Sequence, residues 1–152
     1  MPQTSSRIEV HAPPGVVFGT LWDAGRYPEF LTDVIDVKVA AGAMPSLQTA
    51  TLRTRLVREV TITIGMQGEA PALLTWRLRD GGGWLERYDV AFWIEDLRDG
   101  HSVQLGVEYE IEFLAAVPDA VVRRLFEFSL PTTLRQVKAR AEWLQRRAEM
   151  RL

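Results

Sequence analysis

Five segments between residues 52 and 113 alternate apolar with polar residues, and turn-forming residues separate several of them. A two-residue period places alternate side chains on opposite faces of a β-strand. Turn residues at 68–71, 80–83 and 99–100 are typical of the connections between antiparallel strands. We therefore predict an antiparallel meander with one apolar face, which is covered, and one charged face, which lies in water.

Two more strands and two short helices are predicted before this meander. Residues 7–12 and 35–39 also alternate, so each is expected to form a strand. The two prolines after the first strand suit the opening turn of a helix, and Gly25 is expected to end that helix. Residues 27–31 are predicted to form a second short helix.

A long helix is predicted to follow the meander, over residues 118–149. Pro131 lies inside it, so we expect either a kink there or a new helical segment capped by Ser129. The helical stripe that would face the sheet is Val122, Phe126, Ser129, Thr133, Val137 and Leu144.

Composition excludes several classes of protein. The length of 152 residues suits one domain, and the net charge of −2 argues against a dedicated nucleic-acid binder. No apolar run reaches the ~18 residues of a membrane span, and the first residues lack the features of a signal peptide. The absence of cysteine excludes disulfides and thiolate chemistry. We expect a cytoplasmic protein.

Several short pieces, in this order, resemble one known superfamily. They are residues 10–14, residues 23–31 with Tyr27-Pro28-Glu29-Phe30, Phe92-Trp93-Ile94-Glu95, Asp99-Gly100, and residues 107–113. Over residues 8–142 the chain resembles the START-like (SRPBCC) superfamily, in the polyketide cyclase/dehydrase branch that includes coenzyme Q-binding proteins. The resemblance implies a single START-like ligand-binding domain over residues 1–152.

The fold that this resemblance implies is the α+β helix-grip fold. This fold has a curved antiparallel sheet of about seven strands. Two short helices follow strand 1, as predicted above. The long C-terminal helix packs across the concave face. The two short helices would close one end of the curved sheet, which leaves a pocket between sheet and long helix.

The inner face could form a solid core or enclose a cavity. Large aromatic side chains could fill it completely, but serine, threonine and tyrosine hydroxyls interrupt the apolar surface, which is typical of ligand pockets. We expect a cavity. Its predicted ligand-binding residues are Trp76, Tyr88, Phe92, Tyr109, Phe113, Phe126, Ser129, Leu130 and Thr133.

Glu86 is the one speculative catalytic residue. Counted by twos from Tyr88 it lies on the inner face, where burial would raise its pKa and suit it to acid–base catalysis. A β-bulge would expose it instead, and this second arrangement is the one we expect. His11 and His101 are not expected to lie near a serine or carboxylate as a catalytic triad requires. No metal site, phosphate loop or cofactor is predicted.

Three functional hypotheses remain open. The first is a pocket that binds one hydrophobic small molecule, such as an isoprenoid quinone, a lipid or an aromatic polyketide. The second is a polyketide cyclase, aromatase or dehydratase that uses acid–base residues in the pocket. The third is a protein-interaction module that docks through its arginine-rich C-terminal helix. No nucleic acid is expected as a partner, transient membrane contact is left open, and the oligomeric state is not predicted.

Overall fold

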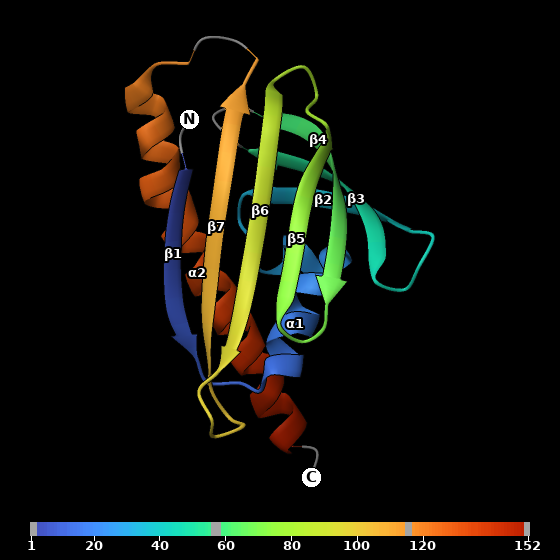
Figure 1. Cartoon of the computed structure of the whole chain (residues 1–152), viewed down its shortest axis with the longest axis vertical. Coiled ribbons are helices and arrows are strands. Elements are labelled where there is room, and N and C mark those ends of the chain that lie inside the picture. The colour runs from blue at the N-terminus through green and yellow to red at the C-terminus, as the bar shows by residue number, and fades with distance from the viewer. Residues whose placement is uncertain (1–2, 56–58, 115–116, 151–152) are drawn as a thin grey trace.

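The protein folds as a seven-stranded antiparallel sheet crossed by one long helix (Figure 1). The computed structural model describes the backbone of residues 3–55, 59–114 and 117–150, and the side chains of these residues except 3–4, 119 and 122–130. The elements are β1 (Gln3–Val10), α1 (Pro14–Trp22), the 3-10 helix η1 (Ala24–Glu29), β2 (Val34–Ala41), β3 (Leu47–Arg55), β4 (Glu59–Glu69), β5 (Leu73–Asp80), β6 (Leu85–Asp96), β7 (Val103–Phe113) and α2 (Asp119–Met150). This order confirms the predicted helix-grip architecture.

The strand order across the sheet is β1-β7-β6-β5-β4-β3-β2. β1 pairs with β7, with Val10 opposite Val103, so the strands that are first and second along the chain form opposite edges. The short helices connect these two edges: α1 contacts β5, β6 and α2, and η1 contacts β2. α2 crosses one face of the sheet diagonally (Figure 1).

The first helix begins where the prolines predicted but ends earlier than expected. Pro13 is extended at the helix N-cap and Pro14 is the first helical residue. Asp23, with ψ of 69°, leaves helical geometry, so α1 ends at Trp22 and Gly25 lies inside η1. The prediction that Gly25 ends this helix is therefore wrong. The second short helix occupies residues 24–29 rather than 27–31.

A glycine lets α1 approach the sheet closely. The Phe18 ring, which stacks on Trp22 with centroids 6.0 Å apart, lies against Gly68 of β4. A Cβ atom at Gly68 would come within 2.7 Å of that ring. The absence of a side chain at Gly68 therefore allows α1 to pack closely against β4.

The predicted alternation between a buried and an exposed face is confirmed. The buried residues on the inner face include Leu52, Ile62, Ile64, Leu74, Val90, Phe92, Val107 and Ile111, and α2 adds Leu134, Val137 and Ala141. Thr133 and Leu144, which the predicted stripe included, are only partly buried. α2 is one continuous helix through Pro131, so a new segment capped by Ser129 is not formed.

Ion pairs between strands occupy the outer, charged face of the sheet. Arg87 on β6 lies 3.1 Å from Glu110 on β7, and Arg53 on β3 lies 2.6 Å from Asp36 on β2 and 3.2 Å from Glu59 on β4. Each exposed pair of this kind contributes only about 0.2–1 kcal/mol. Their effect is mainly to favour one strand register.

Candidate functional site

A small pocket lies between the concave face of the sheet and α2. Its volume, as bounded by the described residues, is about 60 Å³. That is room for about two water molecules, whereas pockets for small organic ligands usually measure about 300–1,000 Å³. A ligand of ordinary size therefore requires the pocket to widen. Its lining is Leu31, Asp33, Val34, Leu52, Thr54, Ile62, Ile64, Trp76, Tyr88, Thr133 and Gln136.

The sheet provides an apolar floor with one hydroxyl whose hydrogen bond is already made. Leu52, Ile62 and Ile64 point inward because of the strand alternation, and all three are buried. Thr54 is also buried, and its hydroxyl donates to the Val60 carbonyl oxygen at 3.3 Å. The floor therefore offers little to the polar end of a ligand.

Tyr88 on β6 adds a phenol hydroxyl to the lining, next to the apolar floor. Burial raises the pKa of its phenol to about 12, and the negative charge of Asp33 adds to this rise. The hydroxyl is therefore protonated at neutral pH and can donate a hydrogen bond. The ring of Tyr109 lies beside it, with centroids 5.9 Å apart.

Trp76 on β5 carries a second donor. Its indole packs between Tyr27 and Phe92, with ring centroids 5.8 and 5.1 Å away. The Nε1 atom is buried and makes no hydrogen bond with the described residues. It lies near the Tyr27 hydroxyl, which donates a hydrogen bond to the Leu21 carbonyl. Burial raises the pKa of the Tyr27 hydroxyl, and the nearby Trp76 indole opposes this rise. The Tyr27 hydroxyl does not line the pocket, so the Trp76 indole contributes its apolar ring to the lining while Nε1 lies toward η1.

Contacts between α2 and residues 29–33 close one side of the pocket. Gln136 Nε2 donates to the Thr32 hydroxyl at 3.0 Å, and the Thr32 N–H donates to Gln136 Oε1 at 3.4 Å. One turn further along α2, Arg140 bonds Glu29 at 2.9 Å, and its guanidinium lies 5.4 Å from the centre of the Phe30 ring. We name these contacts the Gln136–Arg140 clasp.

Glu86 does not lie in the pocket. It is exposed, and the pairing of β6 with β7 shifts register between Leu85 and Arg87. The extra residue in this bulge rotates the Glu86 side chain away from the inner face. The outward alternative is thus the one observed, and a pocket acid or base at this position is excluded.

The other predicted site residues divide into three groups. Trp76, Tyr88 and Thr133 line the pocket. Phe92 is buried beneath Trp76, Tyr109 lies beside Tyr88, and Phe113 packs on Trp84 near the β5–β6 turn with centroids 5.1 Å apart. The side chains of the remaining three, Phe126, Ser129 and Leu130, lie outside the described residues.

Two polar residues of the lining were missed by the sequence interpretation. Asp33 lies in the connection before β2, where no periodicity applies, and Gln136 lies on the edge of the helix stripe that faces the sheet. The available signal for Gln136 was its position next to Val137, a residue of the helix stripe that was predicted to face the sheet.

His11 has the neighbours that the sequence did not lead us to expect. Its Nδ1 lies 3.4 Å from the Ser102 hydroxyl and its Nε2 lies 3.8 Å from a Glu9 carboxylate oxygen. A serine hydroxyl and a carboxylate therefore lie near this histidine. The His11 and Glu9 side chains are both more than half exposed, and these long contacts do not activate a hydroxyl as a catalytic triad does. The described residues hold no cluster suited to a metal ion.

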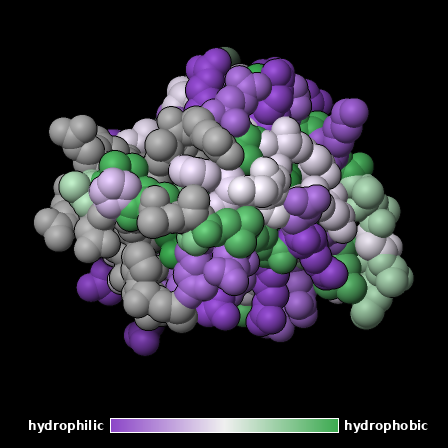
Figure 2. Space-filling model, turned by 90° about the horizontal axis from the view of Figure 1, so that it is seen from above, coloured by the Kyte–Doolittle hydropathy of each residue, from purple (hydrophilic) through white to green (hydrophobic). Residues whose placement is uncertain are grey.

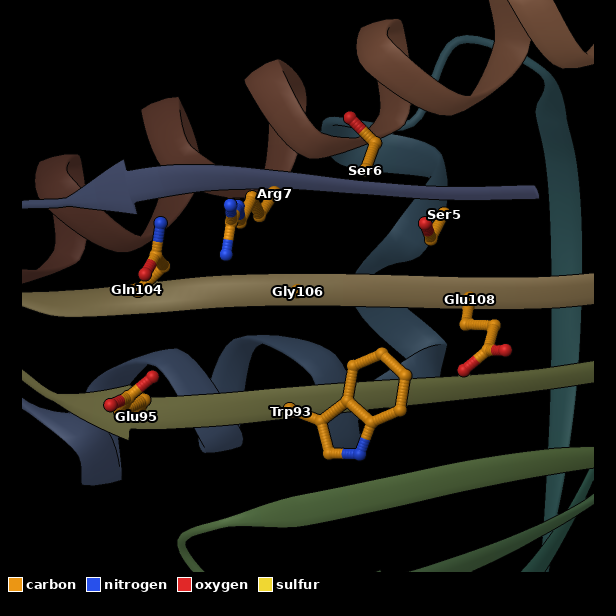
Figure 3. A pocket seen from close by; sticks show the side chains of 8 residues that line it. All are labelled: Ser5, Ser6, Arg7, Trp93, Glu95, Gln104, Gly106 and Glu108. Carbon is orange, nitrogen blue, oxygen red and sulfur yellow. The ribbon is translucent and has the colours of Figure 1, made fainter.

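A larger groove lies on the opposite, convex face of the sheet. It measures about 530 Å³ and is lined by β1, β6 and β7, with the Trp93 indole beside Gly106 (Figure 3). A Cβ at Gly106 would approach the indole to 3.1 Å, so this glycine makes room for the ring. Charged side chains surround the open groove. We take the concave pocket as the candidate site because it is more enclosed, apolar and contains a tyrosine with a shifted pKa.

The arginines near the end of α2 are partly engaged within the chain. The guanidinium groups of Arg140 and Arg147 lie 4.8 and 4.7 Å from the centre of the Trp143 ring. Arg140 also bonds Glu29, so its charge contributes to the clasp. Docking through this surface stays a prediction. In the described part of the chain, no helix has the length and apolar character needed to span a membrane.

Comparison with solved structures finds close matches in fold at low sequence identity. The ZhuI aromatase/cyclase from Streptomyces sp. R1128 matches with a TM-score of 0.82 and 16% identity, over 93% of each chain. A START superfamily protein from Mycobacterium smegmatis matches with a TM-score of 0.82 and 20% identity, over 93% of this chain and 98% of that one. A protein from Thermus thermophilus matches with a TM-score of 0.79 and 14% identity, over 94% of this chain and 99% of that one.

The family comparison is more specific than the fold. No curated protein matches the chain significantly by sequence. The model of one family, described as polyketide cyclase / dehydrase and lipid transport, matches residues 10–138, which include all the described pocket residues. The chain therefore belongs to the polyketide cyclase / dehydrase and lipid transport family and has its START-like fold.

Proposed function

We propose that this protein binds one hydrophobic small molecule between the sheet and α2, as a single ligand-binding domain. The candidate ligands are an isoprenoid quinone, a lipid or an aromatic polyketide. The observation that carries the proposal is the Tyr88 phenol, protonated at neutral pH, in the lining of an enclosed and mainly apolar pocket. A carbonyl or quinone oxygen is an acceptor for this donor.

Binding would depend mainly on desolvation. Hiding about 300 Å² of apolar ligand surface contributes on the order of 7 kcal/mol before the entropic costs of association. The pocket has to widen from about 60 Å³ to admit such a ligand. Opening of the Gln136–Arg140 clasp is the motion we infer, because it releases residues 29–33 from α2 without disturbing the sheet.

The test is a thermal-unfolding assay on delipidated protein with a short-chain ubiquinone analogue, an anthraquinone and a fatty acid. A ligand that binds only the folded state raises the melting temperature by several degrees. Tyr88→Phe should weaken binding of the quinones roughly threefold to tenfold, as expected for one lost hydrogen bond. Tyr109→Phe is the matched control, because this tyrosine lies beside Tyr88 but does not line the described pocket. No shift with any compound would contradict the proposal.

A second candidate function is a cyclase or dehydratase reaction on a poly-β-keto chain. Two residues of the pocket lining favour it, Asp33 and Tyr88, since a carboxylate and a protonated phenol in one pocket could act as base and acid. Turnover of a poly-β-keto thioester should then fall at least tenfold in Asp33→Asn and in Tyr88→Phe. Glu86→Gln should leave turnover unchanged. Equal activity in all three variants would remove this candidate.

A further inference from the structure

Two polar side chains in the lining of the concave pocket are left to meet a ligand. Thr54, Thr133 and Gln136 already have partners within the chain. The Asp33 carboxylate and the Tyr88 hydroxyl also line the pocket, and neither forms a hydrogen bond with the described residues. The polar end of a bound molecule would therefore face these two groups.

Asp33 gives the pocket a negative charge at its rim. Its side chain is exposed, and it is the one charged residue among those described residues that line the pocket. Its charge contributes to the raised pKa of the Tyr88 phenol, so the field of the carboxylate reaches the pocket wall. A ligand that carries its own negative charge at this end would be repelled.

The basic residue that follows the pocket strand β3 does not cancel this charge. The Arg55 N–H donates to the Asp33 carbonyl oxygen at 2.8 Å, so the two backbones are adjacent. Thr54, the residue before Arg55, points into the pocket and Arg55 is exposed, so strand alternation directs the Arg55 side chain to the outer face.

The basic residues on the described part of α2 nearest the pocket lining are engaged elsewhere. Arg135 donates to the Thr132 hydroxyl at 3.2 Å. Lys138 and Arg140 each have a carboxylate partner, at 2.8 and 2.9 Å. Asp33 forms no ion pair with any described residue, so its charge stays uncompensated at the rim.

A hydroxyl group matches the two protein groups. A neutral phenol or alcohol can accept a hydrogen bond from Tyr88 and donate one to Asp33. A carboxylate accepts only and an ammonium donates only, so each would leave one of the two groups without a partner. The rest of the lining is mainly apolar, and Figure 2 shows hydrophobic residues in the middle of the face seen from above, between hydrophilic ones. The matching ligand has an apolar body and one neutral polar end.

We propose that the pocket selects ligands whose polar end is a neutral hydroxyl and rejects carboxylates and phosphates, a selection that rests on the proposed ligand-binding function. Asp33 is the residue that determines it. Tyr88 contributes the donor, and the negative charge of Asp33 both accepts the ligand's proton in a hydrogen bond and repels anionic ligands.

The test compares 4-hexylphenol, 4-hexylbenzoate and 4-hexylanisole by calorimetric titration of delipidated protein at neutral pH and low salt. An apolar pocket alone disfavours the benzoate, so the informative quantity is the change in the benzoate-to-phenol ratio of dissociation constants on mutation. Asp33→Asn should lower this ratio about fivefold, because it removes the repelling charge and keeps the side-chain shape. Wild-type protein should bind the anisole about fivefold more weakly than the phenol, because a methyl ether cannot donate.

Glu86→Gln is the matched control, since it removes one negative charge from an exposed residue outside the pocket. It should leave the ratio unchanged. Three results would overturn the selection while leaving ligand binding intact: an unchanged ratio in Asp33→Asn, an equal fall in Glu86→Gln, or anisole that binds as tightly as phenol. Failure of all three compounds to bind would instead contradict the proposed function, and the selection with it.

Discussion

Glu142, on α2, accepts a hydrogen bond from the backbone N–H of His11 at 2.8 Å, although 131 residues separate the two in sequence. The same carboxylate oxygen bonds Lys138 Nζ at 2.8 Å, and Lys138 also donates to the Glu9 carbonyl at 2.7 Å. Burial alone would raise the pKa of Glu142, but the bonds from Lys138 and the His11 N–H together outweigh burial and hold the pKa below its ordinary value. These contacts fasten α2 to the end of β1.

Glu142→Gln should therefore destabilise the protein by about 1–3 kcal/mol at neutral pH, because it leaves Lys138 without its carboxylate. The folded-state pKa is depressed, so the stabilisation is present above the ordinary pKa of 4.5 and is lost as pH falls below it. Urea unfolding at neutral pH and near pH 3 should show the wild-type advantage shrinking on acidification. Glu149→Gln, on the exposed end of the same helix, should change little.

Gln136→Ala should loosen residues 29–34 without unfolding the sheet. It removes both hydrogen bonds to Thr32, and two partly exposed bonds contribute roughly 1 kcal/mol net. Local opening of this segment should then become about fivefold more frequent. Hydrogen exchange of the backbone amides measures it. Arg135→Ala, one residue earlier and exposed, is the control, and equal protection in wild type and Gln136→Ala would contradict the role of the clasp.

Tyr88 should make stability fall between about pH 10 and pH 12. Its folded-state pKa is raised from 10.0 to about 12, so the stabilisation is complete below pH 10 and is lost as pH rises through the folded value. Over that window the loss should be on the order of 2 kcal/mol larger in wild type than in Tyr88→Phe. Denaturant titrations at several alkaline pH values would measure it. Parallel curves for the two proteins would show that Tyr88 is accessible to water.

Two glycines of the β5–β6 turn, Gly81 and Gly83, should differ sharply in their tolerance of alanine. A Cβ at Gly81 would lie 1.9 Å from the Leu85 carbonyl oxygen, so the backbone has to move. A Cβ at Gly83 meets open space, and only its positive φ of 75° opposes substitution. Gly83→Ala should cost about 1 kcal/mol, and Gly81→Ala should cost at least about twice that. Thermal melts would test the order, and a reversed order would contradict this turn geometry.

The sequence was most informative where one physical rule dominates. Strand alternation placed Leu52, Ile62 and Val90 on the buried face, because a half-buried sheet requires that period. Glu86 shows where the rule stops. A bulge adds a residue without changing the alternating pattern on either side, so only pairing with β7 reveals which way the side chain points.

The polar part of the site was harder to predict for a different reason. Asp33 and Gln136 meet only because the fold brings the start of β2 beside α2, and nothing local in either segment encodes that meeting. The same is true of His11 and Ser102, which are 91 residues apart. Helix ends were also misjudged, since Asp23 ends α1 through its backbone angles although Gly25 is the stronger local signal.

The pairing of β1 with β7 has a consequence for how the chain reaches this state. During synthesis β1 leaves the ribosome before the other strands of the sheet. The strand that pairs with it in the described part of the chain, β7, emerges some 93 residues later, as the pairing of Val10 with Val103 shows. Until then its edge is unprotected and the short helices have no finished surface to cover. Such long-range closure makes folding slow and exposes intermediates to aggregation. Nascent chains that stop short of β7 should therefore depend on chaperones.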